Sequence, residues 1–141
     1  MNDEIKNNAL IEIIPIASDN YAYLVICAKT GLAAAIDPAE PEPILERLRQ
    51  KNARLVAIWN THHHADHTGG NAQLVQTIND AALRVVAHRS DETRVPEFTD
   101  GVEDEDVVAL GEVWARVLHA PGHTRGSIVY LVGDAVFTGD V

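Results

Sequence analysis

The stretch THHHADHTGGN, at residues 61 to 71, concentrates imidazole and carboxylate side chains just before a pair of glycines. Imidazole nitrogens and carboxylate oxygens are the ligand types of catalytic zinc sites, whereas structural zinc sites are typically rich in cysteine. Gly69 and Gly70 remove side chains that would obstruct a close approach of the backbone to such a site. The stretch therefore predicts a metal site with a catalytic role. Its candidate ligands are His62, His64, Asp66 and His67.

The spacing of the histidines indicates which of them converge. Because side chains alternate in extended backbone, His62 and His64 project to one side of the chain and His63 projects to the other. Two imidazoles separated by one residue can therefore share one ion, and we expect His63 to be only their neighbour. Asp66 and His67 follow at the turn into a helix and supply a second pair of ligands.

Two distant segments each place one more candidate ligand directly after a predicted strand. PGHT at 121–124 presents His123 in a tight loop, and TGD at 138–140 presents Asp140 in another. Every candidate ligand thus follows a strand. If those strands share a sheet, their loops gather along one edge and bring together His62, His64, Asp66, His67, His123 and Asp140.

These motifs resemble those of a known family. THHHADH fits the HxHxDH signature of the metallo-β-lactamase-fold hydrolases. The longer THHHADHTGGN, with HAPGHTRGS at 119–127 and FTGD at 137–140, is similar to glyoxalase II, the hydroxyacylglutathione hydrolases. The resemblance implies one metal on His62, His64 and His123, a second metal on Asp66 and His67, and a bridge between the two at Asp140.

The resemblance also implies the cofactors and the reaction. Two divalent metal ions are expected, with zinc as the first choice and iron or manganese as alternatives, since sites of His and Asp accept all three. Two such ions, about 3.5–4 Å apart, share a water and lower its pKa toward neutrality. The metal-bound hydroxide would attack the thioester S-D-lactoylglutathione and release D-lactate and glutathione, a step in methylglyoxal detoxification. Asp66 is expected to be the catalytic carboxylate that orients the hydroxide.

Other functions stay open. Within the same fold, a persulfide dioxygenase uses one iron held by two histidines and an aspartate, and lactonases and β-lactamase-like hydrolases share the HxHxDH core. A different class is a non-catalytic, truncated remnant that binds metal without turnover. The GGN ending and the PGHTRGS segment favour glyoxalase II over these alternatives. Metal content, thioester turnover and oxygen uptake would discriminate between them.

The elements that position these residues alternate between strands and helices. Helices are predicted at 44–51 and after Gly70, where Leu74, Val75 and Ile78 mark one face. The acidic stretch 97–106 is predicted to be a solvated surface loop. Strands are predicted at 10–16, 21–28, 32–37, 54–59, 83–88, 112–120, 127–132 and 135–139.

The pattern indicates mixed α and β structure, and the resemblance implies an α+β fold, the metallo-β-lactamase-like αββα sandwich. Members of that family continue beyond the bridging aspartate with further strands and one more histidine ligand, and glyoxalase II adds a helical region with most of the glutathione contacts. We therefore expect residues 1–141 to be one incomplete domain, mainly the N-terminal half, of a truncated or partial sequence. Strands 127–132 and 135–139 would then lack a partner layer, and an exposed sheet favours self-association.

Composition excludes some classes of partner. The chain has 141 residues, 46% of them hydrophobic, and a net charge of −10, which disfavours nucleic-acid binding. It lacks both a membrane-length apolar run and a basic start typical of a signal peptide. Cys27 is the sole cysteine and is expected to be a buried hydrophobe, which is consistent with a cytoplasmic protein. The partner that the resemblance implies is a small-molecule substrate. His88 and His119 are expected in packing or supporting roles.

Overall fold

The computed structural model describes residues 5–6 and 8–140. The N-terminal segment that was examined for a signal peptide falls mostly outside these residues. Within them, one sheet contains, in spatial order, β1 (Ile5–Lys6), β2 (Ala9–Ile16), β3 (Asn20–Cys27), β4 (Leu32–Ile36), β5 (Arg54–Trp59), β6 (Arg84–His88) and β7 (Asp100–Val102). A second sheet has the order β11 (Ala135–Phe137), β10 (Ile128–Val132), β9 (Val113–His119) and β8 (Val107–Leu110). The helices are α1 (Pro41–Lys51), α2 (Ala65–Thr68), α3 (Asn71–Ile78) and the 3-10 turn η1 (Arg89–Asp91).

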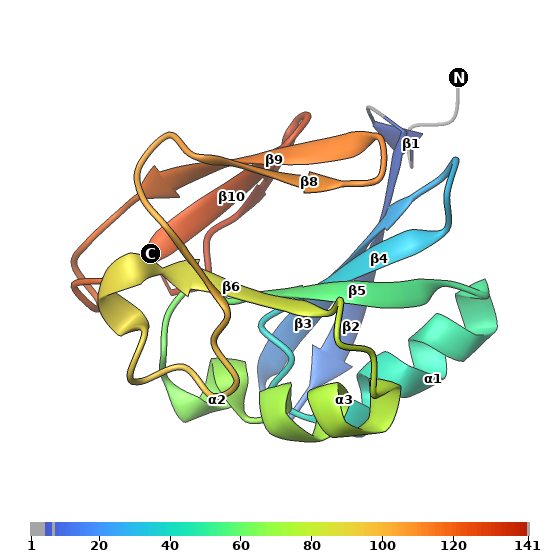
Figure 1. The fold of residues 1–141 in the computed structure, drawn as a ribbon, viewed down its shortest axis with the longest axis horizontal. Helices are drawn as coiled ribbons and strands as arrows, with labels where there is room; N and C mark the ends of the chain where they lie inside the picture. The colour runs from blue at the N-terminus through green and yellow to red at the C-terminus, as the bar shows by residue number, and fades with distance from the viewer. Residues whose placement is uncertain (1–4, 7, 141) are drawn as a thin grey trace.

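The two sheets pack face to face, and α1 and α3 cover the outer face of the larger one (Figure 1). The alternation of side chains along the central strands explains this layering. In β3, Leu24 and Ile26 pack toward the helices, whereas Val25 and Cys27 pack toward the second sheet. Both faces of the larger sheet are therefore apolar, and the α+β class predicted from sequence is confirmed.

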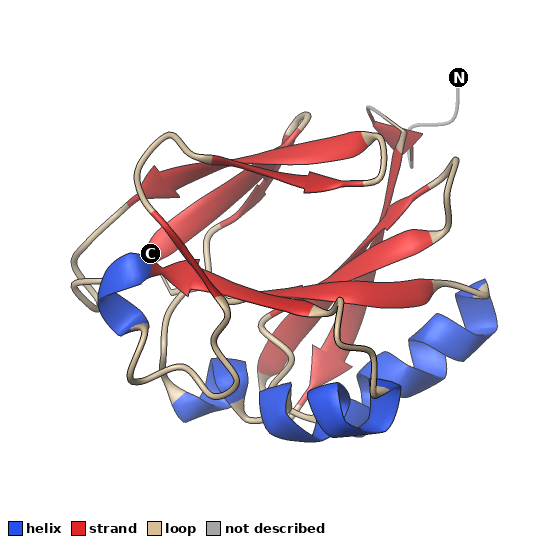
Figure 2. Ribbon diagram, viewed as in Figure 1, coloured by secondary structure: helices blue, strands red, loops and turns tan. Residues whose placement is uncertain are grey.

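The second sheet is covered on one face. Ile128 and Tyr130 of β10 are fully buried against the first sheet, so the expectation that strands 127–132 and 135–139 lack a partner layer is wrong for this face. On the opposite face, Trp114 is 56% exposed and Val136 is 54% exposed. Among the described residues, no helix lies over that face (Figure 2). Self-association through it stays a prediction.

The structure corrects several predicted boundaries. The stretch 97–106 is not entirely a solvated loop, because β7 adds to the sheet edge and Asp100 pairs with Arg84 of β6. Strands of three residues (β7) and four residues (β8) are too short to show a clear period of two, which is why the sequence analysis missed both. Helix α1 begins at Pro41 rather than at 44, because proline is well tolerated in the first turn of a helix.

Two other expectations concern single features of the chain. Cys27 is a buried, free cysteine, as predicted. None of the helices within the described part of the chain has the length and apolar character needed to cross a lipid bilayer.

Gly69 and Gly70 serve the packing of the loop after β4, not the metal-ligand cluster itself. A Cβ atom on Gly70 would lie 2.5 Å from the carbonyl oxygen of Pro38, and one on Gly69 would lie 2.7 Å from that of Ala39. The Gly70 N–H also donates to the Pro38 carbonyl oxygen over 2.7 Å. The two glycines therefore let the segment between α2 and α3 rest directly on the backbone that follows β4.

Replacing Gly70 by alanine should lower the free energy of unfolding by about 1–3 kcal/mol, since the new methyl group would meet backbone that cannot move aside. Gly122→Ala is the matched control, because nothing lies within 4 Å of a Cβ atom built there. Chemical denaturation of both variants measures the difference. Equal stability of the two would contradict this account of the glycine pair.

Candidate metal centre

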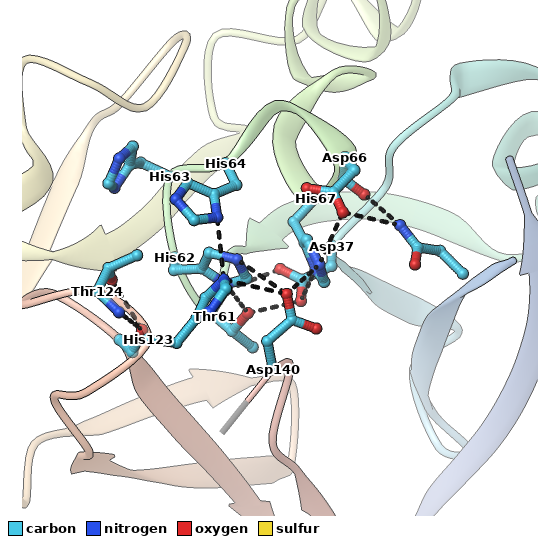
Figure 3. Close-up of polar contacts among 12 residues, drawn as sticks. Asp37, Thr61, His62, His63, His64, Asp66, His67, His123, Thr124 and Asp140 are labelled. Carbon is cyan, nitrogen blue, oxygen red and sulfur yellow. Dashed lines mark hydrogen bonds and ion pairs between the residues drawn. The ribbon is translucent and has the colours of Figure 1, made fainter.

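The candidate ligands meet where strands of both sheets end (Figure 3). The segment from His62 to His67 follows β5 of the larger sheet, whereas His123 follows β9 and Asp140 follows β11 of the smaller sheet. The sequence argument assumed strands of one shared sheet, and that assumption is wrong. The loops converge because two packed sheets present their strand ends at the same side of the molecule.

One group of three ring nitrogens comes from His62, His64 and His123, and its ligand atoms lie within 4.8 Å of one another. Within it, His123 Nε2 lies 3.0 Å from His64 Nδ1. His62 is buried, His64 is half-buried and His123 is exposed. The group is therefore open to solvent on the His123 side, as a site that admits a substrate must be.

A second group contains His62, His67 and Asp140, again within 4.8 Å. Asp140 Oδ2 lies 3.3 Å from His67 Nε2, 3.3 Å from His123 Nε2 and 3.5 Å from His62 Nε2. This single carboxylate oxygen thus faces nitrogens of both groups. Asp66 lies beside the second group, with its Oδ2 atom 3.6 Å from His67 Nε2.

Asp37, which the sequence analysis did not select, is a buried carboxylate beneath the two groups. Its Oδ1 accepts the Thr61 N–H over 2.8 Å, and its Oδ2 accepts the Thr61 hydroxyl over 2.7 Å. His67 Nδ1 lies 3.0 Å from the same Oδ2 and donates to it. The available signal was a single aspartate at the end of the apolar strand LAAAI, directly before Pro38.

This network assigns the ring tautomers. Because the Thr61 hydroxyl donates to Asp37, its oxygen accepts a hydrogen bond from His62 Nδ1, 3.0 Å away. His62 and His67 therefore both carry their proton on Nδ1 and direct the Nε2 lone pair into the site. Both Nε2 atoms are buried and have no hydrogen-bond partner among the described residues. Buried, orphaned imidazole nitrogens beside a carboxylate fit a divalent metal ion.

Electrostatics act in opposite directions on the two rings. Burial, together with the neighbouring His67, lowers the pKa of His62 to about 4, so its ring is neutral at pH 7. Burial also acts to lower the pKa of His67, but the hydrogen bond to Asp37 and the charges of Asp37 and Asp140 raise it above its usual value. Burial acts to raise the pKa of Asp66, but the Asn20 side-chain amide and the nearby His67 lower it. Asp66 is therefore ionised at neutral pH.

The remaining histidines lie around the ligands. His63 points away from the two groups toward Asp91, with 3.6 Å between its Nδ1 and Asp91 Oδ1. His119 Nε2 donates to the Arg125 carbonyl oxygen over 2.7 Å, and its ring stacks on His88 at 4.3 Å between ring centroids. His119 therefore braces the loop that carries His123 and is not part of either ligand group.

Asn20, the first residue of β3, also contacts the candidate ligands. Its side-chain amide donates to the Asp66 carbonyl oxygen over 3.0 Å and to Asp66 Oδ2 over 3.3 Å. These two bonds hold the exposed carboxylate of Asp66 in one orientation. The β2–β3 turn therefore takes part in arranging the site.

Comparison with known proteins shows which family the chain resembles. A sequence model of the Metallo-beta-lactamase superfamily matches residues 21–141. The hydroxyacylglutathione hydrolase of Pelagibacter ubique is 39% identical over 132 residues, which are 92% of this chain and 54% of that protein. The chain spans about half the length of the curated relatives it matches.

Solved structures share the fold. The crystal structure of ETHE1 from Myxococcus xanthus superposes with a TM-score of 0.79 and 31% identity, over 93% of this chain and 57% of that one. A protein crystallised in a di-iron-bound form superposes with a TM-score of 0.73 and 28% identity, over 91% of this chain and 70% of that one. The family match at residues 21–141 includes the positions of all six candidate ligands.

Asp37→Asn should weaken metal binding by about 10- to 100-fold, because its NH2 group would replace one acceptor oxygen and face a donor, either the Thr61 N–H or the Thr61 hydroxyl and His67 Nδ1. Asp80→Asn is the control, since Asp80 pairs with Arg54 away from the site. Titration with zinc in competition with a chelator measures the affinity. Unaltered zinc affinity in Asp37→Asn would show that the carboxylate does not orient the ligands.

Proposed function

The chain belongs to the metallo-beta-lactamase superfamily, and from this membership and the geometry of its metal centre we propose that it is the metal-binding part of a glutathione thioester hydrolase. The substrate we propose is S-D-lactoylglutathione, split by water into D-lactate and glutathione. The 39% identity with a hydroxyacylglutathione hydrolase over 92% of the chain supports this reaction. Residues 1–141 are proposed to form one domain of the metallo-β-lactamase type.

The position of Asp140 is the observation that carries the proposal. Its Oδ2 atom lies within 3.3–3.5 Å of three histidine Nε2 atoms that belong to the two ligand groups. A carboxylate in that position is suited to bridge a pair of ions. We therefore assign His62, His64 and His123 to one divalent ion, His67 and Asp66 to the other, and Asp140 to both. Zinc is the ion we expect, with iron or manganese as alternatives.

Bound divalent ions supply Lewis acidity, which lowers the pKa of a bound water toward neutrality and polarises a carbonyl oxygen. The chain's own residues do the rest. His62 stays neutral and keeps its Nε2 lone pair for coordination, because burial lowers its pKa to about 4. Asp66 stays ionised, so its carboxylate would be able to accept a hydrogen bond from a water held there and to orient it. The departing thiolate needs little general acid, since thiols are much stronger acids than alcohols.

A cavity of about 240 Å³ opens beside this arrangement. Its volume suits the small acyl group of such a thioester better than the whole molecule, because sites that bury drug-sized ligands are typically about 300 Å³ or larger. The glutathione moiety would then extend past the cavity mouth. The lining residues are Asp19, Asn20, Tyr21, Tyr23, Asp37, His67, Val136, Thr138, Gly139 and Asp140.

An iron-dependent persulfide dioxygenase is the second candidate. The observation that supports this candidate is the structural likeness to ETHE1 from Myxococcus xanthus, at 31% identity. The two candidates differ in metal content and in chemistry. Two ions with thioester turnover support the hydrolase, and one iron with oxygen uptake supports the dioxygenase. Bound metal with neither activity would indicate a non-catalytic metal-binding protein.

In the full-length protein, His123→Ala should remove one equivalent of metal and lower kcat/KM for S-D-lactoylglutathione by at least 100-fold, since His123 is a proposed ligand on the open side of the site. Elemental analysis and a thioester assay measure the two effects. His63→Ala should be much milder, because His63 belongs to neither ligand group. Full metal content in His123→Ala would refute the first-site assignment.

Asp140→Ala should loosen both ions rather than one, because its Oδ2 faces both ligand groups. Stepwise chelation of the loaded full-length protein provides the measurement, and two weakened binding steps are expected. If Asp140→Ala retained two ions as tightly as the unaltered protein, Asp140 would not be a bridge.

A further inference from the structure

Asp91 is a buried carboxylate that no step of the proposed reaction uses. It ends η1, is 0% exposed, and neither of its oxygens has a hydrogen-bond partner among the described residues. A carboxylate taken out of water without such partners carries a desolvation penalty that lowers the stability of the fold. Ordinary packing therefore does not account for its position.

The surroundings of Asp91 connect it to both loops that carry the first ligand group. His63 Nδ1, which is also buried and without a hydrogen bond, lies 3.6 Å from Asp91 Oδ1. On the other side is Gly126 of the His123 loop, where a Cβ atom would lie 2.5 Å from Asp91 Oδ2. Arg94, whose Nη1 lies 3.5 Å from Oδ1, supplies a positive charge from the surface.

The backbone keeps this carboxylate in place. The Arg94 and Val95 N–H groups donate to the Asp91 carbonyl oxygen over 2.9 and 3.0 Å. Asp91 is thus anchored to the segment after β6, and its side chain reaches from there between the two ligand loops. A small shift of either loop changes its distance to the carboxylate.

We propose that Asp91 is a positioning residue that sets the geometry of the first metal site by holding the His63 side chain and the Gly126 backbone at a fixed separation. His63 lies between His62 and His64, so an attraction at His63 orients both ligands. Gly126 lies three residues after His123, so its contact with Asp91 limits how far that ligand can move. The inference rests on the proposed metal centre. It gives a positioning role to His63, although its side chain points away from both ligand groups.

The test compares Asp91→Asn, His63→Gln and the double variant in the full-length protein. Asparagine keeps the shape of Asp91 and removes its charge, and glutamine removes the imidazole of His63 without leaving a large void. Asp80→Asn again serves as the control carboxylate. Binding of Co²⁺ to each metal-free variant is measured in competition with a chelator, and the binding step that disappears in His64→Ala identifies the first site. Thermal unfolding of the metal-free proteins is measured in parallel.

Each single variant should weaken Co²⁺ binding at the first site by about 10-fold or more. The double variant should bind Co²⁺ about as tightly as whichever single variant has the lower affinity, because both changes break the same contact. Metal-free Asp91→Asn should be as stable as the unaltered protein or more stable, because a neutral amide replaces a buried carboxylate that has no hydrogen bond. A purely structural residue would instead lower the stability and leave the affinity unchanged. If Asp91→Asn does not fold, the Co²⁺ affinity of His63→Gln is the test. Unchanged first-site affinity in that variant would overturn the proposal.

Failure of this inference differs from failure of the proposed function. If the unaltered protein bound no Co²⁺ at the histidine cluster, the metal centre itself would be wrong. If it bound two ions and split the thioester while Asp91→Asn and His63→Gln kept unaltered affinity, only the positioning role would be wrong.

Discussion

The buried carboxylate of Asp37 is the constraint on which the site depends. It accepts hydrogen bonds from the backbone and side chain of Thr61 and from His67, so one side chain joins the end of β4 to the loop after β5. The same bonds place protons on the Nδ1 atoms of His62 and His67 and leave their Nε2 atoms for a metal. Asp37 has a φ of 53°, a left-handed conformation that aspartate tolerates better than most residues, and this turns its side chain under the loop.

Contacts between the sheets extend this constraint to the distant ligands. Trp59 of β5 stacks on Tyr130 of β10 at 5.4 Å, and the Tyr130 hydroxyl donates to the Asn60 carbonyl oxygen over 2.9 Å. The Ile128 N–H donates to the Thr61 carbonyl oxygen over 2.9 Å. The chain just before His62 is therefore attached to the strand that follows the His123 loop. Apolar packing brings the sheets together, and these bonds set their relative position near the ligands.

Asp37 and Asp91 are two buried aspartates in opposite circumstances. Asp37 is fully hydrogen-bonded and orients its neighbours directly, whereas Asp91 has only ion-pair distances to His63 and Arg94. A satisfied buried carboxylate rigidifies its surroundings, and an unsatisfied one carries a desolvation penalty. The first is explained by the tautomers it fixes. The position of Asp91 is explained by the proposed role, in which it keeps the two loops that carry the first ligand group at a fixed separation.

The sequence by itself determined the candidate ligand residues, the strand before each loop that carries them and the α+β class, because these follow from residue chemistry and from local periodicity. It also separated His63 from His62 and His64, since alternation in extended backbone is a local property. It did not determine that β5 lies in one sheet and β9 and β11 in another, nor that Asp37, Asn20 and Asp91 surround the ligands. Those residues lie 24 to 46 positions from the loop residues they contact, as Asp37 does from Thr61 and Asn20 from Asp66. Only the packing of two sheets decides such contacts, because no periodic pattern in the sequence indicates which distant segments will bury or hydrogen-bond one another.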